Sequence, residues 1–515
     1  MESGTPEHTR AGMRTRPGEF VAASDPQRIG RFLLLRGMGL VYFVAFAAFW
    51  RQGPFLFDSN GLTPISLYLR RASNALGPEA LSRLPSLFWL DESDGAVAAI
   101  GIAGVALSFA VLLGLENAAV MAVLWVFHVS VVNAGQDWYG YGWETLLAEA
   151  GFLSIFLCSP WGVGPRGARR SAAVQIWLFR WLIFRILLGA GLIKLRGDPC
   201  WRELTCLIWH YETQPNPHPL SILFHWMPPW FHAGGVLFNH FVELICPFFL
   251  LGPPRLRWAG GLAMALFQGM LILSGNLAFL NWLTLFIGIS AFDDAFWRRV
   301  FPDLEGWLSG ARATTPMSRF HRGILAVLVA FVTWRSVPVV DNLFFAERQA
   351  MNRSYDPLHL VNTYGAFGSV GDQRFEAVVQ GTNADPADPA TRWLDYEFVC
   401  KPGDISRPPC LITPYHLHLD WQMWFIPLQG VENHRWVVNL LAKILAGDPR
   451  TLGQFAVDPF GGVAPGAVRF AKFQYQFVEP GERNWWSREA RGNYIRPLTR
   501  DDPALAKILA EEGWD

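Results

Sequence analysis

Long apolar runs separated by short polar connections fill the first two thirds of the chain. At about 1.5 Å per residue, a run of about 20 residues crosses a bilayer as a helix. Two of the runs, 118–133 and 277–292, are short, so a tilted, re-entrant or buried position is an alternative for them. The pattern predicts a multi-span α-helical membrane domain over residues 31–340. Its nine candidate spans are 31–50, 95–115, 118–133, 142–160, 174–193, 234–251, 258–273, 277–292 and 323–340.

The pattern changes after Asp341, where short segments alternate in polarity between Pro, Gly, Asn and Asp residues. Alternation with aromatic and β-branched residues is typical of strands. An apolar stretch at helical spacing, 434–446, ends at Gly447 before Pro449, which is a normal helix stop. We therefore expect a soluble, mainly antiparallel β-domain over residues 341–515. The candidate strands are 358–364, 375–380, 393–400, 411–419 and 468–478.

Composition agrees with a membrane protein. Of 515 residues, 51% are hydrophobic and 24 are tryptophan, and these values exceed those of average soluble domains. The 43 basic and 43 acidic residues cancel, so the net charge does not point to a nucleic-acid partner. Residues 1–30 are polar and show no cleaved signal peptide, which predicts an N-terminal cytoplasmic tail. The apolar runs that follow predict contact with membrane lipid.

Arginines cluster in alternate connections, as the positive-inside rule requires. With an odd number of spans, this places the N-terminus in the cytoplasm and puts residues 341–515 across the membrane. The loop after the fifth run then shares the outer compartment with the C-terminal domain. The arginines are Arg166, Arg169, Arg170, Arg255, Arg257, Arg298, Arg299, Arg312 and Arg319.

Six of the ionisable residues within or beside the apolar runs form a predicted charge network. An unpaired charge at bilayer depth is costly, so such residues are paired or functional. We expect the acidic members to neutralise the cations of run 174–193 and its end, and catalysis is the minor alternative. This predicted charge network comprises Glu144, Glu149, Arg180, Arg185, Lys194 and Glu243.

The connection 194–219, KLRGDPCWRELTCLIWHYETQPNPHP, carries more chemistry than a simple linker. One interpretation is a hydrated loop with interfacial tryptophans; the other is a functional loop that contacts a client protein. If the chain is an enzyme, Lys194 or His210 serves as base with Glu212 orienting it. Common catalytic motifs are missing, so no catalytic residue is assigned. The functional-loop residues are Asp198, Trp201, His210, Tyr211, Glu212, Gln214 and Pro215.

Cysteines and histidines give two further expectations. Cys400 and Cys410 are predicted to form a disulfide in an oxidising compartment. Cys200 and Cys206 are a weaker pair, since a helix between them would hold their Cα atoms about 9 Å apart.

A strand at 411–419 would extend to place His416, His418 and Asp420 on one face. A polar strand face explains these three residues without a metal, because a fourth ligand is not evident. We expect no metal and no cofactor.

Several segments resemble the lipase maturation factor family. They are WETLLAEAGFL at 143–153, FRWLIFRILLGAGLIKLRGDPCWRELT at 179–205, HYETQPNPHPL at 210–220, FVELICPF at 241–248 and DWQMWF at 420–425. The resemblance extends from about Arg31 to Tyr494.

The resemblance implies a membrane-anchored factor that helps secreted lipases fold and assemble, acting as a chaperone rather than as a lipase. The location of such a factor would be the endoplasmic reticulum membrane in a eukaryote or the inner membrane in a bacterium. The Arg-, Ala- and Gly-rich N-terminal composition of this chain suggests a bacterial protein. The expected partner is a secreted or exported client, such as a lipase. The alternative is a multi-span enzyme similar to the helical domain of vitamin K-dependent carboxylase.

Overall fold

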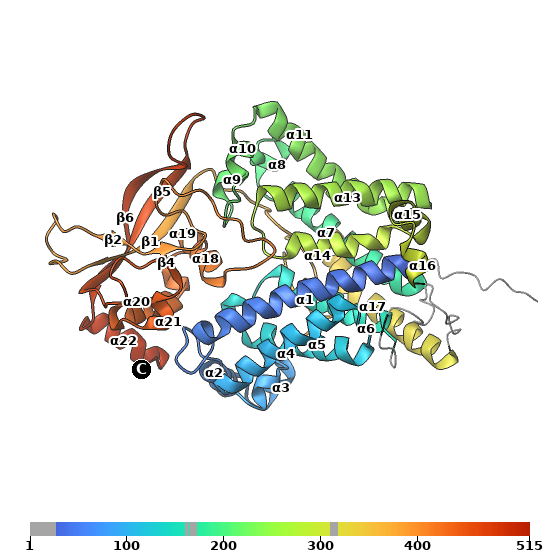
Figure 1. Cartoon of the computed structure of the whole chain (residues 1–515), viewed down its shortest axis with the longest axis horizontal. Coiled ribbons are helices and arrows are strands. Elements are labelled where there is room, and N and C mark those ends of the chain that lie inside the picture. The colour runs from blue at the N-terminus through green and yellow to red at the C-terminus, as the bar shows by residue number, and fades with distance from the viewer. Residues whose placement is uncertain (1–26, 160–163, 165–172, 309–317, 515) are drawn as a thin grey trace, which may run out of the picture.

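The structure, a computed structural model, describes residues 27–159, 164, 173–308 and 318–514. It consists of a helical bundle and a C-terminal domain that covers one end of the bundle (Figure 1). The predicted helical membrane domain and antiparallel C-terminal sheet are both confirmed.

The bundle is built from long apolar helices joined by short helical turns. The long helices are α1 (Arg28–Leu56), α4 (Asp94–Leu113), α5 (Ala118–Ala134), α6 (Gly142–Leu157), α7 (Ala173–Arg196), α13 (Pro254–Ser274) and α17 (Arg319–Phe344). Between them lie α2 (Ile65–Leu76), α3 (Ala80–Arg83), α8 (Pro199–Arg202), α9 (Cys206–Thr213), α10 (Ser221–His225), α11 (Pro229–His240), α12 (Cys246–Phe249), α14 (Leu280–Gly288), α15 (Asp294–Val300) and α16 (Leu304–Leu308). The single turns are η1 (Gly77–Glu79), η2 (Leu87–Trp89), η3 (Gln136–Trp138), η4 (Phe241–Ile245) and η5 (Ile289–Ala291).

Each of the nine apolar runs lies in helix, but the runs differ in length. Within the described residues, five helices are long and apolar enough to cross a membrane: α1, α4, α7, α13 and α17. The run 234–251 is divided among α11, the π turn η4 and α12. The short run 277–292 gives only the nine-residue α14 and the turn η5. The helical character of these runs is therefore confirmed, and the described residues of five of them form helices of spanning length.

Small residues let the first two long helices approach closely. A Cβ added at Gly104 on α4 would lie 2.4 Å from the ring of Phe46 on α1. One at Gly39 on α1 would lie 2.7 Å from the backbone nitrogen of Leu112. Close backbone approach at small residues is the usual way that helices associate in lipid.

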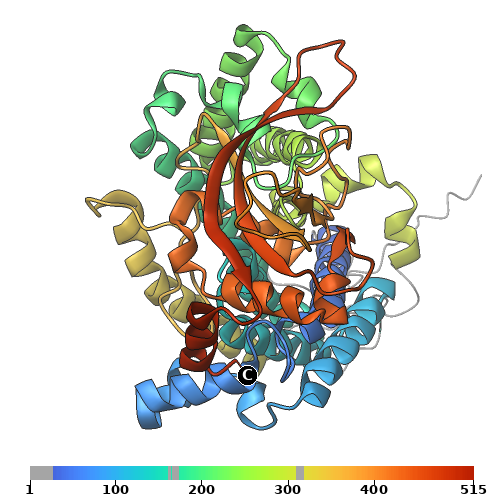
Figure 2. The same ribbon diagram turned by 90° about the vertical axis from the view of Figure 1, so that its left-hand side faces the viewer.

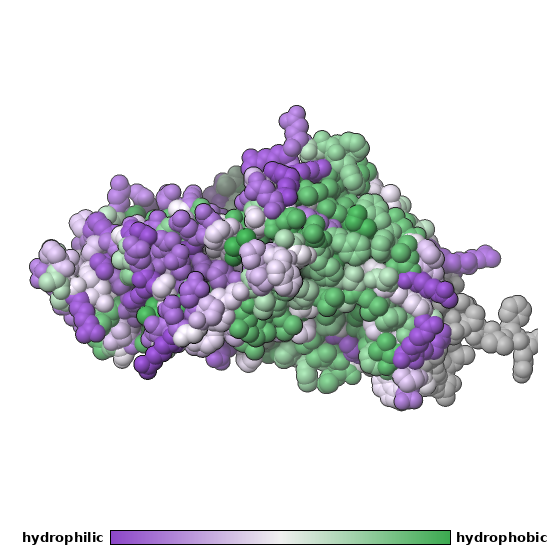
Figure 3. Space-filling view, turned by 90° about the horizontal axis from the view of Figure 1, so that it is seen from above, coloured by the Kyte–Doolittle hydropathy of each residue, from purple (hydrophilic) through white to green (hydrophobic). Residues whose placement is uncertain are grey.

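The face of the bundle drawn in Figure 3 carries an apolar belt between two polar ends. One polar end is the C-terminal domain, and the other lies near α15 and α16 (Figures 1 and 3). Helix α1 begins near α16 and runs toward the C-terminal domain. Arg166, Arg169, Arg170, Arg312 and most of the predicted cytoplasmic tail lie outside the described residues.

The C-terminal domain contains a four-stranded antiparallel sheet in the order β2-β1-β5-β6. Its strands are β1 (Arg374–Thr382), β2 (Leu394–Asp395), β5 (Ala467–Phe477) and β6 (Trp486–Thr499), and a separate pair is formed by β3 (Glu397–Phe398) and β4 (Phe455–Val457). Phe375 pairs with Gln474, and Phe470 pairs with Ile495, across the two long ladders. The long β5–β6 hairpin curves across the end of the bundle (Figure 2).

Helices complete the C-terminal domain. They are α18 (His418–Met423), α19 (Ile426–Gln429), η6 (Val431–Asn433), α20 (Trp436–Ala446), α21 (Pro449–Leu452) and α22 (Pro503–Glu512). The predicted helix at 434–446 is confirmed as α20, which ends at Gly447 in the left-handed conformation.

Two of the five predicted strands are wrong, and one is partial. Residues 358–364 and 411–417 have no strand pairing beyond one isolated bridge, between Ser354 and Asn362. Both segments are irregular, because His359 has a φ of 54° and residues 413–415 form a turn. Their backbone nitrogens donate to side chains of the bundle instead of to a neighbouring strand. Segment 393–400 forms only the short β2 and β3.

Candidate functional site

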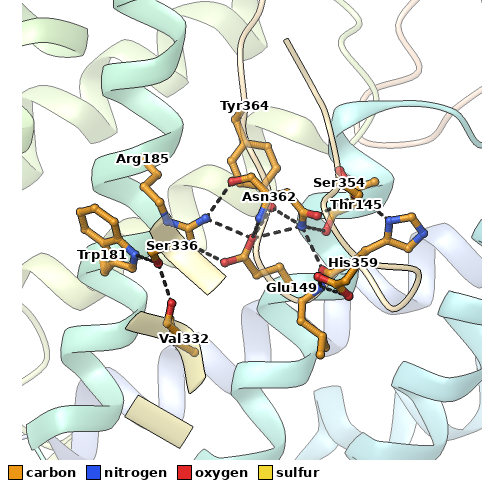
Figure 4. A network of polar contacts seen from close by, with 12 residues as sticks. Thr145, Glu149, Trp181, Arg185, Val332, Ser336, Ser354, His359, Asn362 and Tyr364 are labelled. Carbon is orange, nitrogen blue, oxygen red and sulfur yellow. Dashed lines mark hydrogen bonds and ion pairs between the residues drawn. The ribbon is translucent and has the colours of Figure 1, made fainter. Parts of the chain in front are cut away.

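The centre of the bundle holds a buried ion pair between Glu149 on α6 and Arg185 on α7 (Figure 4). Each side chain is 1% exposed. A buried ion pair offsets its desolvation only when further hydrogen bonds satisfy the remaining polar atoms. In the structure, Glu149 therefore pairs with a cation of α7, Arg185.

Those further hydrogen bonds come from a segment that follows the bundle in sequence. The backbone nitrogen of Asn362 donates to Glu149 Oε2 at 3.0 Å, and the hydroxyl of Tyr364 donates to the same oxygen at 2.7 Å. Arg185 Nη1 donates to the carbonyl of Asn362 at 2.8 Å. Asn362 thus bonds to a carboxylate that lies 213 positions earlier in the chain (Figure 4). The network fixes the chain leading into the C-terminal domain.

A second buried pair joins α7 to the π turn η4. Lys194 Nζ lies 2.7 and 2.8 Å from the two carboxylate oxygens of Glu243 and donates to Asn239 Oδ1 at 2.9 Å. The π turn begins two residues before Glu243, and such bulges often occur where a side chain is positioned for a specific contact. This pairing also agrees with the predicted network.

The other two predicted members take different partners. Arg180 donates to the carbonyl of Ser290 at 2.7 Å rather than to a carboxylate of α6. Glu144 accepts from Trp143 Nε1 at 3.0 Å and lies 3.6 Å from His128 Nε2. Pairing of Glu144 with a cation of α7 is therefore not observed.

One buried charge cluster was missed from the sequence. Glu116, at the turn between α4 and α5, lies 3.0 Å from Arg31 and 2.9 Å from Arg36 on α1. The signal was present, since both arginines lie in the first apolar run and Glu116 lies between two others.

The connection after α7 is a folded structure rather than a hydrated loop. It forms α8 and α9, in which Trp201, His210, Tyr211 and Glu212 are at most 7% exposed. Gln214 is 1% exposed. Most of the predicted functional-loop residues therefore face protein, and direct contact with a client through these side chains is not available in this conformation.

What α9 contacts is the C-terminal domain. Arg374, the first residue of β1, donates from Nη1 to the carbonyl of Glu212 at 2.7 Å and from Nη2 to that of Pro215 at 3.0 Å. The carbonyls at a helix C-terminus lack intrahelical donors and carry partial negative charge. A guanidinium at this position donates hydrogen bonds to these carbonyls and also offsets their partial negative charge. Glu376 balances the cation, and Lys401 lies 2.8 Å from Glu376.

The reverse contact comes from Glu212. Its Oε2 accepts from the backbone nitrogen of Phe477 on β5 at 2.9 Å. Trp424 Nε1 donates to the carbonyl of Thr213 at 2.9 Å. We call this set, Glu212, Thr213, Arg374, Trp424 and Phe477, the interdomain joint.

Two amide side chains at the same end of the bundle strengthen the attachment of the C-terminal domain to the bundle. Asn276, between α13 and α14, donates to the carbonyls of Pro217 and Cys410 and accepts from the nitrogen of Ile412 at 3.0 Å. Gln52 on α1 donates to the carbonyl of His416 at 2.7 Å. These contacts replace the strand pairing that the sequence predicted for 411–419.

Two disulfides lie at this end. Cys400–Cys410 is confirmed. Cys200–Cys206 also forms, with Cα atoms 4.8 Å apart. The helix assumed between them is interrupted, because Leu204 has a φ of 63° and the chain turns back before α9 begins.

His416, His418 and Asp420 do not share a strand face, because α18 begins at His418. Asp420 accepts from the backbone nitrogens of Cys400 and Lys401. Burial raises its pKa to about 6, and burial lowers the pKa of Lys401 to about 8. Within the described residues, no group of three His, Cys, Asp or Glu could hold a metal ion.

The three residues named for a catalytic alternative are not joined into one group. Lys194 pairs with Glu243, and Glu212 bonds to the backbone of β5. Among the described contacts, none links Lys194, His210 and Glu212 by a hydrogen bond. The geometry favours structural roles for Lys194 and Glu212.

Comparison with known proteins agrees with this architecture. Residues 29–299 match the family described as lipase maturation factor transmembrane domain, and residues 360–496 match the lipase maturation factor C-terminal domain. No solved structure matches the chain.

Individual relatives align over nearly the whole chain. Lipase maturation factor 1 of Bos taurus is 45% identical over 92% of this chain and 89% of its own length. The Homo sapiens protein of the same name is 43% identical over 94% of this chain and 90% of its own length. Lipase maturation factor 2 of Homo sapiens is 26% identical over 94% and 85%. With two domain matches and these identities, the chain belongs to the lipase maturation factor family.

Proposed function

We propose that the chain is a membrane-anchored maturation factor that assists the folding and assembly of a secreted lipase-like client. The observation that carries this proposal is the alignment with both family domains and, at 43–45% identity, with lipase maturation factor 1 over about nine tenths of its length. The carboxylase-type alternative has no support from these comparisons.

The proposal includes a location for the C-terminal domain. That domain covers the end of the bundle opposite α15 and α16 (Figure 1). Cys400–Cys410 lies in it, and Cys200–Cys206 links α8 to α9, whose C-terminal end contacts it. Disulfides persist in oxidising compartments. The proposed location is the lumen of the endoplasmic reticulum in a eukaryote, or the periplasm in a bacterium.

The client surface is proposed to lie on the C-terminal domain, since most of the functional-loop residues are buried against protein. Strand β6 is the edge of the four-stranded sheet, and residues 487–493 are exposed on both faces. An exposed edge presents unpaired backbone groups to which an extended segment can add as a further strand. A partly folded client offers such segments before its own sheets close.

The test of function is complementation. Cells lacking lipase maturation factor 1 would express a secreted dimeric lipase with or without this chain, and active lipase in the medium would be measured per unit of lipase protein. We expect a higher specific activity with the chain. An equal specific activity, with the chain present and folded in the membrane, would contradict the proposal.

The surface can be tested separately by photocrosslinking. A photoreactive residue at Glu489 or Asn493, both exposed on β6, is expected to capture the co-expressed lipase. The same residue at Lys507, exposed on α22, is the control. Capture from Lys507 alone would assign the client to another face while leaving the maturation role intact.

A further inference from the structure

A cavity of about 640 Å³ lies between the helical bundle and the C-terminal domain. Its rim includes the exposed residues Asp137, Gly140 and Gln429. Its walls are mainly aromatic and aliphatic and come from both domains. They include Trp143, Ile186, Leu187, Phe267, Trp421 and Phe425. The volume lies in the range of about 300–1,000 Å³ that is typical of small-molecule sites.

Two amide side chains form a polar spot in this apolar cavity. Gln268 on α13 and Asn281 on α14 line it, and each is 4% exposed. Gln268 lies six residues before the end of α13, or about 9 Å along the helix, so the amides lie inside the bundle rather than at its surface.

The amide pair is only half satisfied by protein. Asn281 Nδ2 donates to Gln268 Oε1 at 2.8 Å. Among the described residues, Gln268 Nε2 and Asn281 Oδ1 have no hydrogen-bond partner. If both amides were turned over, one donor and one acceptor would still remain free. Buried polar groups without partners are costly, so this pair is suited to a ligand that can both accept and donate.

The charges in the buried part of the cavity, beyond the exposed carboxylate of Asp137 at its rim, indicate a neutral ligand. Its described lining contains the carboxylates of Asp137 and Glu243 but no lysine or arginine. Glu243 is already neutralised by Lys194. An anionic head group would therefore find no free cation, and a cationic one would find both oxygens of Glu243 occupied.

We propose that this cavity binds a neutral amphiphile with a single apolar chain, whose hydroxyl or amide head bonds to the pair Gln268 and Asn281. The chain packs against the aromatic walls. Because Trp421 and Phe425 close the cavity from the C-terminal domain, bound ligand contacts both domains at once and favours their attached arrangement.

The experiment uses the full chain in nanodiscs and a 1-monooleoylglycerol analogue with a diazirine in its alkyl chain. We expect saturable labelling of peptides containing residues 143–146, 186–190 or 421–425. Excess 1-monooleoylglycerol should compete, and dioleoyl phosphatidylcholine, with two chains and a charged head, should not.

Variants test the two parts of the site. Gln268→Leu removes the free donor and should weaken binding roughly fivefold to tenfold, as expected for about one hydrogen bond. Ala190→Met fills space in the cavity wall and should reduce labelling further. Ala106→Met, on the exposed face of α4, is the matched control and should leave labelling unchanged.

Three results would overturn the inference. The first is labelling confined to the exposed faces of α4 and α17. The second is labelling that neither Gln268→Leu nor Ala190→Met changes, when both variants unfold at the same temperature as the parent chain. The third is competition by oleate but not by 1-monooleoylglycerol. Binding is measured without any client, so its failure and a failure of the maturation role are separate results.

Discussion

At the scale of single residues, the buried carboxylate of Glu149 joins three other residues of the bundle and of the chain that follows it. It accepts from Arg185, Asn362 and Tyr364, which come from α7 and from the chain that follows α17. A residue with so many contacts in a low-dielectric interior is strongly coupled to its neighbours. The network therefore acts as the polar core of the bundle.

Glu149→Ala should strand Arg185 as an unpaired buried cation. We expect a loss of about 3–5 kcal/mol in the free energy of unfolding, measured as a lower yield of monodisperse protein in detergent and a lower unfolding temperature. Glu79→Ala, which breaks the exposed pair with Arg83, is the control and should have little effect.

Combining Glu149→Leu with Arg185→Met should recover part of that loss, since an apolar pair removes both charges. Parent-like yield for Glu149→Ala alone would contradict the ion-pair interpretation and return Glu149 to the list of binding or catalytic candidates.

Asp420 gives a pH dependence with a definite sign. Its folded pKa is about 6 because of burial, above the ordinary value of about 3.9 for aspartate. Between these values the folded state binds more protons than the unfolded state, so stability should fall as pH rises from about 4 to 6. The loss is on the order of 2 kcal/mol.

Asp420→Asn keeps an oxygen that accepts from Cys400 and Lys401 but cannot titrate. Unfolding temperatures of the parent chain and the variant, measured between pH 4 and 7, should therefore diverge as pH rises, with the parent becoming relatively less stable. Parallel curves would show that Asp420 has an ordinary pKa.

At the scale of elements, the interdomain joint explains why the HYETQP segment is so polar and yet buried. The C-terminal end of α9 exposes carbonyls, and β1 supplies a guanidinium that satisfies them. If this segment were the hydrated loop that the sequence allowed as one interpretation, Glu212→Ala would leave folding intact. Because Glu212 is 7% exposed and accepts from Phe477, its removal should instead weaken the attachment of the sheet.

Arg374→Met should loosen the joint without removing apolar volume. Several carbonyls of residues 212–215 would lose their donor, and Glu376 would keep only Lys401 as a close cation. We expect a lower unfolding temperature and faster proteolysis between the domains in residues 345–373. Arg491→Met, on the exposed β6, is the matched control. Equal rates of proteolysis for the two variants would contradict the role of Arg374 in holding the two domains together.

At the scale of the whole molecule, an apolar belt separates the C-terminal domain from the end that carries α15 and α16 (Figure 3). Within the described residues, five helices are long and apolar enough to cross a membrane. The proposed orientation follows from the arginine-rich connections and from the disulfides beside the C-terminal domain.

Cysteine labelling of intact cells or sealed vesicles tests this orientation. Asn383→Cys, in an exposed turn of the C-terminal domain, should react with an impermeant maleimide added outside. Asp303→Cys, exposed near α16 at the other end, should react only after permeabilisation. The two free cysteines in the described residues, Cys158 and Cys246, are buried, which keeps the background low. The reverse pattern would overturn the orientation.

The sequence by itself determined the helical nature of all nine apolar runs, the presence of an antiparallel C-terminal domain, the Cys400–Cys410 bond and the family. Hydropathy, strand periodicity and a short cysteine loop are local properties, so they can be read from neighbouring residues. The same reasoning placed Glu149, Arg185, Lys194 and Glu243 in buried pairs, because a charge within an apolar run requires a partner.

Tertiary structure alone decided which partner each group takes. Asn362 reaches Glu149 across 213 residues and Arg374 reaches Glu212 across 162, and no local pattern encodes such distances. The segment 411–419 alternates like a strand, but Gln52 and Asn276 satisfy its backbone in place of a neighbouring strand. Local periodicity records which faces of a segment are apolar; the identity of the surface that covers them is set only when distant segments pack together.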